Sequence, residues 1–281
     1  AATLTVAGER LTVDYDGTSP ETLLGAINCS MNYTRGSTFV ALKAALVPEI
    51  PANEALFEPV EVVAPLGSIL NCRPPVAVKG RSAVAVHTHD AIFGALAPVI
   101  PDQVQAGAGT FWGVWALGRH PDGRAFNAAM IVNGGIGGSG RRDGLSATSY
   151  PWNSVATSSE IYENHAPILV LRKELISGSA GVGRFRGGLG QRLVFRPAGE
   201  TPVTVGLRPV NLRFPPPGLR DGPPGTLGRV LWNGEATAQN RFDLHAGDEV
   251  TCELPGGGGF GPPEARDAAL RARDVAQGYL A

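Results

Sequence analysis

Residues 228–254, GRVLWNGEATAQNRFDLHAGDEVTCEL, decide the expected fold class. The runs GRVLW (228–232) and EVTCEL (249–254) are rich in residues that favour strands, and Asn233-Gly234 is a clear two-residue hairpin signal. Three similar runs precede this stretch, separated by Gly and Pro turns: ILVLRKELI (168–176), QRLVF (191–195) and PVTVGL (202–207). This spacing predicts a sheet-rich region.

The upstream part of the chain mixes strand and helix patterns. TLTVAGERLTVDY (3–15) alternates apolar and polar side chains around a glycine turn, which predicts a hairpin. Apolar residues at helical spacing predict helices over 37–47 and 82–98, the second capped by Ser82. A glycine-rich surface loop is expected over 134–148. Further strands are predicted over residues 60–63, 109–118 and 125–132.

These patterns together predict an α+β fold that is sheet-rich, with a few helices and many Gly and Pro turns. The chain of 281 residues holds 38 Gly and 23 Pro, more than an average globular chain. We expect a hairpin-plus-helix α+β region over 1–157 and a sheet-rich region over 158–281 that ends in a C-terminal helix. No linker fixes this boundary, so a single domain is the alternative.

Composition disfavours several classes of partner. With 24 Lys and Arg against 25 Asp and Glu, the net charge of −1 gives no field that would attract nucleic acid or an anionic membrane. No apolar run approaches the roughly 20 residues that cross a bilayer, so we expect a cytoplasmic location. The chain begins with Ala1 instead of Met, so we expect that an upstream segment is missing. The widely spaced cysteines are expected to be free thiols: Cys29, Cys72 and Cys252.

His87-Thr88-His89-Asp90 is the first candidate for a metal site. On a strand, both imidazoles would share one face and could bind zinc. On the predicted helix, residues two apart point roughly 200° apart and cannot share a metal. The remaining histidines form no second motif, so we favour ordinary histidines and assign no metal ligand to this chain.

Asp14-Tyr15-Asp16-Gly17 is the second candidate. Two carboxylates on one side of a strand end can bind a divalent cation, but the same residues form a common turn. The calcium-loop pattern fails because Ser19 stands where that loop needs glycine. A structural turn is therefore favoured, and Asp14 and Asp16 are kept as substrate-binding or structural candidates.

Two stretches have the glycine spacing of dinucleotide-binding loops: Gly135, Gly137 and Gly140, and then Gly256, Gly258 and Gly261. No helix follows the first, and the second lies too close to the chain end for the strand and the acidic ribose ligand of that motif. Neither contains the Gly-Lys-Ser/Thr of a triphosphate loop. We interpret both as structural glycine turns and expect no ATP or other cofactor to be bound by this chain alone.

The most distinctive stretch is SGSAGVGRFRGGLG (177–190). Its glycines permit close backbone approach, and the planar guanidinium groups of Arg184 and Arg186 suit carboxylates. Two hypotheses fit: direct contact with a substrate, or a structural ion pair of Arg184 or Arg186 with Glu160 or Glu163. The structural hypothesis is slightly favoured.

Four stretches together resemble the hydantoinase B/oxoprolinase family, whose B-type subunits include relatives in ketone carboxylases. Their order and separation are those of the family, and the likeness covers nearly the whole chain. The stretches are DYDGTSP (14–20) followed by Asn28, APLGSILNCRPP (64–75), SAGVGRFRGGLG (179–190) preceded by Glu160 and Glu163, and PGGGGFGPPEARD (255–267).

The chain departs from the family pattern in two places. Members usually open the arginine-glycine stretch with an acidic residue and a Gly-Gly pair, where this chain has Gly178 and Ala180, which argues against a carboxylate role there. In the family, the B-type subunit continues upstream of the DYDGTS-like motif, and that part carries the His and Asp residues regarded as metal ligands. The resemblance therefore implies a C-terminal portion of a B-type subunit.

The resemblance also implies a division of labour. An A-type subunit would bind ATP and activate the amide oxygen of a small cyclic amide, and the B-type subunit would supply a metal-activated water. ATP and a divalent metal are thus implied for the full complex, whose other parts are the missing N-terminal portion and the A-type subunit. This chain would supply scaffold and subunit interface, with no catalytic residue assigned and no activity in isolation. The alternatives are a component of an ATP-dependent ketone carboxylase and a purely structural assembly subunit.

Overall fold

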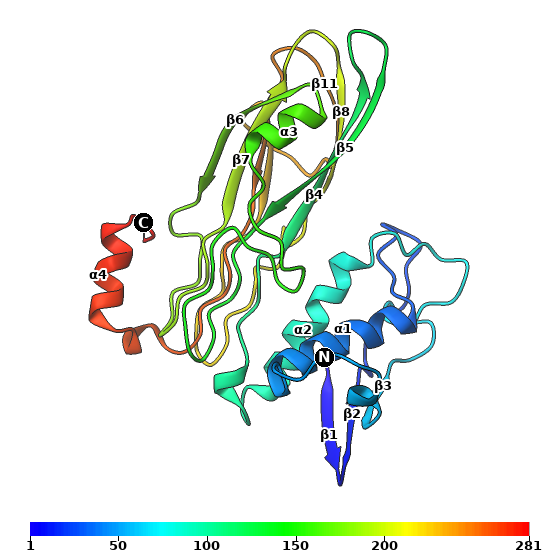
Figure 1. Cartoon of the computed structure of the whole chain (residues 1–281), viewed down its shortest axis with the longest axis vertical. Helices are drawn as coiled ribbons and strands as arrows, with labels where there is room; N and C mark the ends of the chain where they lie inside the picture. Colours follow the sequence, from blue (N-terminus) through cyan, green and yellow to red (C-terminus); the bar gives the residue numbers. More distant parts are fainter. Residues whose placement is uncertain (281) are drawn as a thin grey trace. The chain divides into compact units, whose positions relative to one another are not determined.

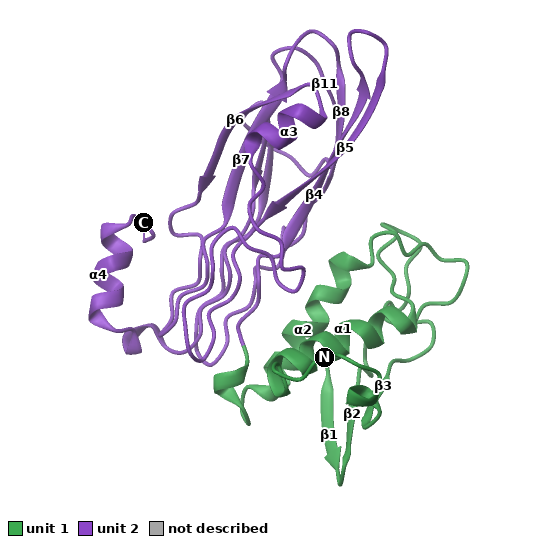
Figure 2. Ribbon diagram, viewed as in Figure 1, with its two compact units in different colours: residues 1–104 green, residues 105–281 purple. Residues whose placement is uncertain are grey.

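The computed structural model describes residues 1–280 and divides the chain into two compact units, residues 1–104 and residues 105–281 (Figure 2). The α+β class is confirmed, because helices accompany the sheets in both units. The division lies upstream of the boundary expected after residue 157. The reason is strand pairing: the hairpin over 111–133 shares a sheet with the strands over 203–208 and 241–244. No helix within residues 1–280 combines the length and the apolar character needed to cross a membrane.

Unit 1 is a three-stranded sheet accompanied by two long helices (Figure 1). The predicted hairpin is confirmed, since β1 (Thr3–Ala7) pairs antiparallel with β2 (Arg10–Asp14). β3 (Val60–Val63) pairs in parallel with β2, which gives the order β1-β2-β3. The helices pack against each other, and short 3₁₀ turns complete the unit; these elements are α1 (Met31–Leu46), α2 (Ser82–Leu96), η1 (Ala55–Phe57) and η2 (Pro101–Gln103).

Both predicted helices exist, but α1 begins six residues before the predicted start at Ser37. The pattern missed its first turns because polar residues occupy the buried face. Thr34 and Thr38 are fully buried, and their hydroxyls donate to the carbonyl oxygens of Leu70 (2.5 Å) and Thr34 (2.8 Å). In α2 the predicted cap Ser82 is the first helical residue, and Arg81 occupies the cap position.

Unit 2 is built on two antiparallel sheets (Figure 1). The first has the order β10-β9-β12-β7-β6 and the second the order β11-β8-β4-β5. The predicted Asn233-Gly234 turn is confirmed, because it joins β9 to β10. The strands are β4 (Phe111–Arg119), β5 (Ala125–Asn133), β6 (Ile168–Leu175), β7 (Gln191–Pro197), β8 (Val203–Arg208), β9 (Arg229–Trp232), β10 (Glu235–Ala236), β11 (Arg241–Leu244) and β12 (Val250–Glu253).

The inner faces of these two sheets form one apolar core. Trp112 and Met130 of the four-stranded sheet and Leu193 and Phe195 of the five-stranded sheet belong to the same buried cluster. Each fully buried side chain of this size contributes roughly 1.5–3 kcal/mol through the hydrophobic effect. Three further helical elements belong to unit 2: α3 (Ser159–His165), η3 (Pro263–Ala265) and α4 (Ala268–Ala276).

Beside the sheets, unit 2 contains a region that we call the glycine layer, seen in Figure 1 as wavy, nearly parallel chains without strand arrows. Backbone hydrogen bonds link its segments, for example from Gly109 N–H to Gly135 O and from Gly181 N–H to Gly257 O. At many of its glycines the spacing leaves no room for a side chain. A Cβ added to Gly135 would lie 1.9 Å from Gly188 O. The segments of the layer are residues 105–109, 134–148, 177–190, 215–228 and 254–261.

The surface loop predicted over 134–148 is therefore wrong for its glycine-rich first part, residues 134–138, whereas Arg141, Arg142 and Leu145 are exposed. Gly134, Gly135, Gly137 and Gly138 are buried, although the segment is polar and glycine-rich. Burial is possible because their peptide groups find partners in neighbouring segments: Gly135 N–H donates to Pro255 O and Gly138 N–H donates to Gly258 O. A composition typical of loops here specifies a close-packed interior.

The three cysteines are free thiols, as predicted. Cys29 and Cys252 are buried, and Cys72 is half-buried. Burial raises the pKa of Cys29 and of Cys252 to about 12, so both thiols stay protonated and unreactive at neutral pH.

Candidate functional site

Arg186, a candidate from the arginine-glycine stretch, lies in a buried ion-pair cluster of unit 2. Its Nε is 3.4 Å from Asp274 Oδ1, and its guanidinium lies over the ring of Tyr279. Asp274 is fully buried, and Arg186 is 4% exposed. The ion pair expected with Glu160 or Glu163 is therefore wrong for Arg186, because a carboxylate 88 residues further along the chain takes that place.

Arg266 and Asp143 complete the ion-pair cluster. The Arg266 guanidinium has no exposed side-chain surface, and it donates to Asp143 Oδ1 (2.8 Å) and to Asp274 Oδ2 (2.6 Å). Burial alone would raise the pKa of Asp143, but hydrogen bonds from Arg266 and from the Arg186 backbone N–H lower it overall. The cluster joins three parts of unit 2. Asp143 and Arg186 belong to the glycine layer, Arg266 follows η3, and Asp274 lies in α4. The cluster thus fastens the C-terminal helix to the layer.

The other candidates of that group lie elsewhere. Arg184 is exposed, with its guanidinium over the Phe185 ring, and it makes no ion pair within the described residues. Glu163 Oε1 accepts from Val170 N–H (2.8 Å), which joins α3 to β6, and Glu160 lies exposed in the first turn of α3. The structure therefore does not gather the four candidates into one site.

The glycine triplets are packed against protein and offer no cradle for phosphate. A Cβ at Gly137 would lie 1.9 Å from Ala106 O, and one at Gly258 would lie 2.0 Å from Pro217 O. The space beside these backbones is thus filled by other segments of the glycine layer. The residues of this part of the chain do not fit a nucleotide, and we derive no step through one.

In unit 1, Asp14 and Asp16 form the favoured structural turn. Asp14 Oδ1 accepts from Asp16 N–H (2.9 Å), which is the bond of an Asx turn. The turn directs the intervening Tyr15 into the core, where only 1% of its surface is exposed. The residues that follow, Thr18 and Ser19, border a cavity of about 230 Å³ together with Tyr15.

This cavity, which we call the unit 1 cavity, is where two of the four distinctive stretches meet. Ile69 and Leu70 of APLGSILNCRPP line it together with residues of DYDGTSP. The third wall is α2, which contributes His87, Thr88 and Ala91. Backbone hydrogen bonds hold the two stretches together, since Ile69 N–H donates to Ser19 O (2.9 Å). Residues far apart in sequence thus enclose one small space.

A hydroxyl network lies behind the wall of the unit 1 cavity. Tyr15 Oη is 2.8 Å from Thr38 Oγ1, and Ser37 Oγ is 2.9 Å from Thr88 Oγ1. His89 Nε2 lies 3.1 Å from Ser37 Oγ, so a buried imidazole ends the chain of hydroxyls. Burial raises the pKa of Tyr15, which keeps its hydroxyl neutral. The network fixes both helices and the turn around the cavity.

The two histidines of α2 occupy different environments. His87 is exposed at the cavity, with Nδ1 3.2 Å from Asp90 Oδ2, whereas His89 is 2% exposed. They do not converge on one point, and no group of three or more His, Cys, Asp or Glu side chains within residues 1–280 is arranged to hold a metal ion. The side chains present do not fit a metal, so no step is derived through one.

His89 gives unit 1 a specific pH dependence. Burial lowers the pKa of His89 from 6.5 to about 4, so acid protonates this group in the unfolded chain before it does so in the folded one. Above pH 6.5 this group therefore does not lower the free energy of unfolding. As the pH drops toward 4, the free energy of unfolding decreases by about 3 kcal/mol in total. Urea unfolding followed by circular dichroism from pH 7 to 4 measures this loss.

The matched variants for that measurement are His89→Gln and His87→Gln. Stability of His89→Gln should vary less over this pH interval than that of the parent chain, because the titrating group is gone. His87→Gln is the matched control, because it removes an exposed ring of the same helix and leaves the buried His89 in place. Equal pH profiles for the parent and His89→Gln would contradict the assignment.

The chemistry of the unit 1 cavity suits a small, neutral, polar molecule. Its lining combines the apolar residues Ile69, Leu70 and Ala91 with the polar residues Thr18 and Ser19, and the exposed His87 stands at its border. Pockets for drug-sized ligands are usually roughly 300–1,000 Å³, so this cavity matches a single small ring. Most of its lining carries no local sequence motif, since only the turn and the histidines stand out in the sequence.

A model of the family described as Hydantoinase B/oxoprolinase matches residues 1–263. The chain belongs to this family. The resemblance inferred from the four distinctive stretches is thus confirmed.

Relatives within the hydantoinase B/oxoprolinase family include both named and uncharacterised proteins. A protein of Methanocaldococcus jannaschii is 30% identical over 95% of this chain and 47% of its own length. A Pseudomonas protein described as the putative B-type component of a D-/L-hydantoinase is 32% identical over 67% of this chain and 33% of its own. The beta chain of caprolactamase from Pseudomonas jessenii is 29% identical over 82% of this chain and 43% of its own. The chain therefore spans less than half the length of these relatives.

Two solved structures share the fold. The ATP-dependent caprolactamase of Pseudomonas jessenii superposes with a TM-score of 0.83 at 23% identity, covering 100% of this chain and 51% of the other. Acetone carboxylase in its nucleotide-free structure superposes with a TM-score of 0.84 at 18% identity, covering 99% of this chain and 43% of the other. Hydantoinase B-type architecture thus occurs in an amide hydrolase and in a carboxylase.

Proposed function

We propose that this chain is part of the B-type subunit of an ATP-dependent cyclic-amide hydrolase, in which it provides the framework, a subunit interface and one wall of the substrate cavity. The observation that carries the proposal is the unit 1 cavity. There the DYDGTSP and APLGSILNCRPP stretches and α2 border one space with apolar walls and hydroxyl groups. The similarity to the caprolactamase beta chain and to the hydantoinase component supports a cyclic amide as the substrate class.

The chemistry explains why a second polypeptide is needed. An unstrained amide is a poor electrophile, so its oxygen must be activated, and phosphoryl transfer from ATP supplies that activation. The glycine layer has no room for a nucleotide, and the described residues offer no metal site. We therefore place ATP on an A-type partner, and any metal on polypeptide outside these residues. This chain would orient the ring and exclude water from the part of the cavity that it lines.

The proposal is tested by reconstituting the complete B-type subunit with its A-type partner. Ring opening of hydantoin, 5-oxoproline or caprolactam should require ATP and both subunits, with ADP released in step with product. The isolated chain should neither hydrolyse ATP nor open a ring. Turnover by the isolated chain, or ring opening without ATP, would contradict the proposal.

A ketone carboxylase is the second candidate, because the fold of acetone carboxylase superposes over 99% of this chain. The same framework would then border a cavity for a small ketone. Acetone and bicarbonate, supplied with ATP to the reconstituted complex, separate the two functions. Bicarbonate-dependent loss of acetone without ring opening of any lactam would favour the carboxylase.

Filling the unit 1 cavity is expected to lower kcat/KM of the assembled enzyme by at least about tenfold. Ala91 lines the cavity from α2, so Ala91→Phe places a bulky ring where the substrate would lie. Ala44→Phe is the matched control, because Ala44 is an exposed alanine of α1 outside the cavity. Unchanged kcat/KM in a folded Ala91→Phe enzyme would exclude the unit 1 cavity as a substrate wall.

A further inference from the structure

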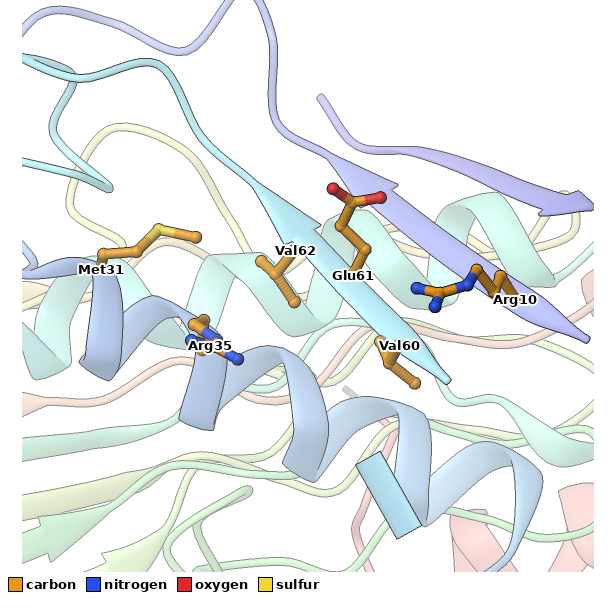
Figure 3. A pocket seen from close by; sticks show the side chains of 6 residues that line it. All are labelled: Arg10, Met31, Arg35, Val60, Glu61 and Val62. Atoms are coloured by element: carbon orange, nitrogen blue, oxygen red, sulfur yellow. The ribbon is translucent and has the colours of Figure 1, made fainter. Parts of the chain in front are cut away.

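A second hollow of unit 1 lies between α1 and β3, away from the unit 1 cavity. This groove has a volume of about 400 Å³ and an apolar floor of Met31, Val60 and Val62. Figure 3 shows Val60 and Val62 pointing toward α1, with Glu61 pointing away from it. Arg35 of α1 and Arg10 of β2 stand at its border. We call this hollow the edge groove.

The edge groove runs along an unpaired sheet edge. β3 is the last strand in the order β1-β2-β3. The carbonyl groups of Pro59 and Val63 point toward β2, since they accept from Leu11 N–H and Tyr15 N–H. Backbone groups of neighbouring residues alternate in direction along a strand, so the N–H and C=O groups of Val60 and Val62 point outward. They have no backbone partner among residues 1–280.

The charges at the edge groove are unbalanced. Arg10 and Arg35 have no ion-pair partner and no hydrogen-bond acceptor for their guanidinium groups within the described part of the chain. Glu61 also lines the groove and accepts from Thr12 Oγ1 (3.4 Å), so one carboxylate stands against two guanidinium groups and the lining keeps a net positive charge. The first turn of α1, which begins at Met31, has no acidic residue, so nothing there offsets the positive potential. The groove therefore favours a negatively charged occupant.

We propose that the edge groove binds an extended, acidic segment of a separate polypeptide, which adds a strand to β3. Outward N–H and C=O groups of Val60 and Val62 would pair with its backbone, Met31 and the valines would hold its apolar side chains, and Arg10 and Arg35 would pair with its carboxylates. A second copy of β3 fits less well, because it brings one glutamate against two arginines. This inference does not depend on the proposed amide hydrolysis.

The test uses the whole 281-residue chain and a synthetic peptide of sequence TVEVEVT, with a TVKVKVT peptide as its charge-reversed control. The acidic peptide should bind, and hydrogen exchange at the amides of Val60 and Val62 should slow on binding. The Arg10→Glu/Arg35→Glu double variant should bind it about tenfold more weakly or worse. Arg141→Glu, at an exposed arginine of unit 2, is the matched control and should bind as the parent does.

Each other outcome overturns the proposal. Equal binding of the two peptides would show that charge does not select the occupant. Binding without slowed exchange at Val60 and Val62 would place the peptide elsewhere. The amides of Val60 and Val62 could also be protected in the absence of peptide. If the double variant loses both this protection and a dimer seen by sedimentation, the edge binds a second copy of the chain.

Discussion

Replacing Arg266 by Ala is expected to destabilise unit 2 by about 3–5 kcal/mol. The guanidinium is fully buried, and its removal leaves the buried Asp274 with the longer contact from Arg186 Nε (3.4 Å) as its remaining ion pair within the described residues. An uncompensated buried carboxylate is among the most destabilising features that one substitution can create. All four tryptophans, at positions 112, 115, 152 and 232, lie in unit 2, so tryptophan fluorescence during urea unfolding reports on this unit.

The matched control for Arg266→Ala is Arg271→Ala. Arg271 lies nearby on α4 and is exposed, and within residues 1–280 its guanidinium donates only to the Pro263 carbonyl oxygen (3.0 Å). Its loss should change the unfolding free energy by less than about 0.5 kcal/mol. If both variants unfold at the same urea concentration as the parent, the ion-pair cluster does not stabilise the glycine layer.

Replacing Gly135 by Ala is expected to destabilise unit 2 by about 3 kcal/mol or more, or to prevent folding. The added methyl group would lie 1.9 Å from Gly188 O and 2.9 Å from Leu189 O, and both are backbone atoms that a rotamer change cannot move. Relief requires shifting a whole segment, which breaks the bonds from Gly135 and Gly188 N–H to Pro255 O and Ile136 O. Urea unfolding followed by fluorescence measures the effect.

Gly206→Ala provides the comparison for that experiment. Gly206 lies in β8 of the same unit, and a Cβ there would have no neighbouring atom within 4 Å. We expect this variant to be as stable as the parent within about 1 kcal/mol. Similar stability of the Gly135 and Gly206 variants would show that the glycine layer can expand, contrary to its close packing.

Regular elements with a clear period could be predicted from sequence, and buried polar regions could not. The hairpin over 3–15 and the Asn233-Gly234 turn follow from short local signals, and the structure has both. The first turns of α1 were not predicted, because Thr34 and Thr38 are polar and yet buried with their hydroxyls hydrogen-bonded. The glycine layer was not predicted for a related reason. Its glycines are typical of loops, and they are buried only because segments distant in the sequence pack against them.

The candidate site shows the same limit. Asp14 and Asp16 gave the turn, and His87 and His89 marked α2. The cavity that Tyr15, Thr18 and His87 border together with Ile69 and Leu70 depends on tertiary packing. The sequence marked Arg186 as a substrate-binding or structural candidate, but its partner Asp274 lies in a helix that no local pattern connects to it. Residue type therefore suggested the chemistry, and long-range contacts selected the partners.

The glycine layer should respond to temperature differently from the apolar core beside it. Its glycines bury peptide groups, and fewer apolar side chains are buried there than between the two sheets, so the water-driven attraction that weakens on cooling contributes less to the layer. Its cohesion rests on amide-to-carbonyl contacts, whose burial changes heat capacity with the opposite sign to that of apolar surface. On cooling, the glycine layer should keep its structure while the apolar core between the two sheets loses part of its stabilisation.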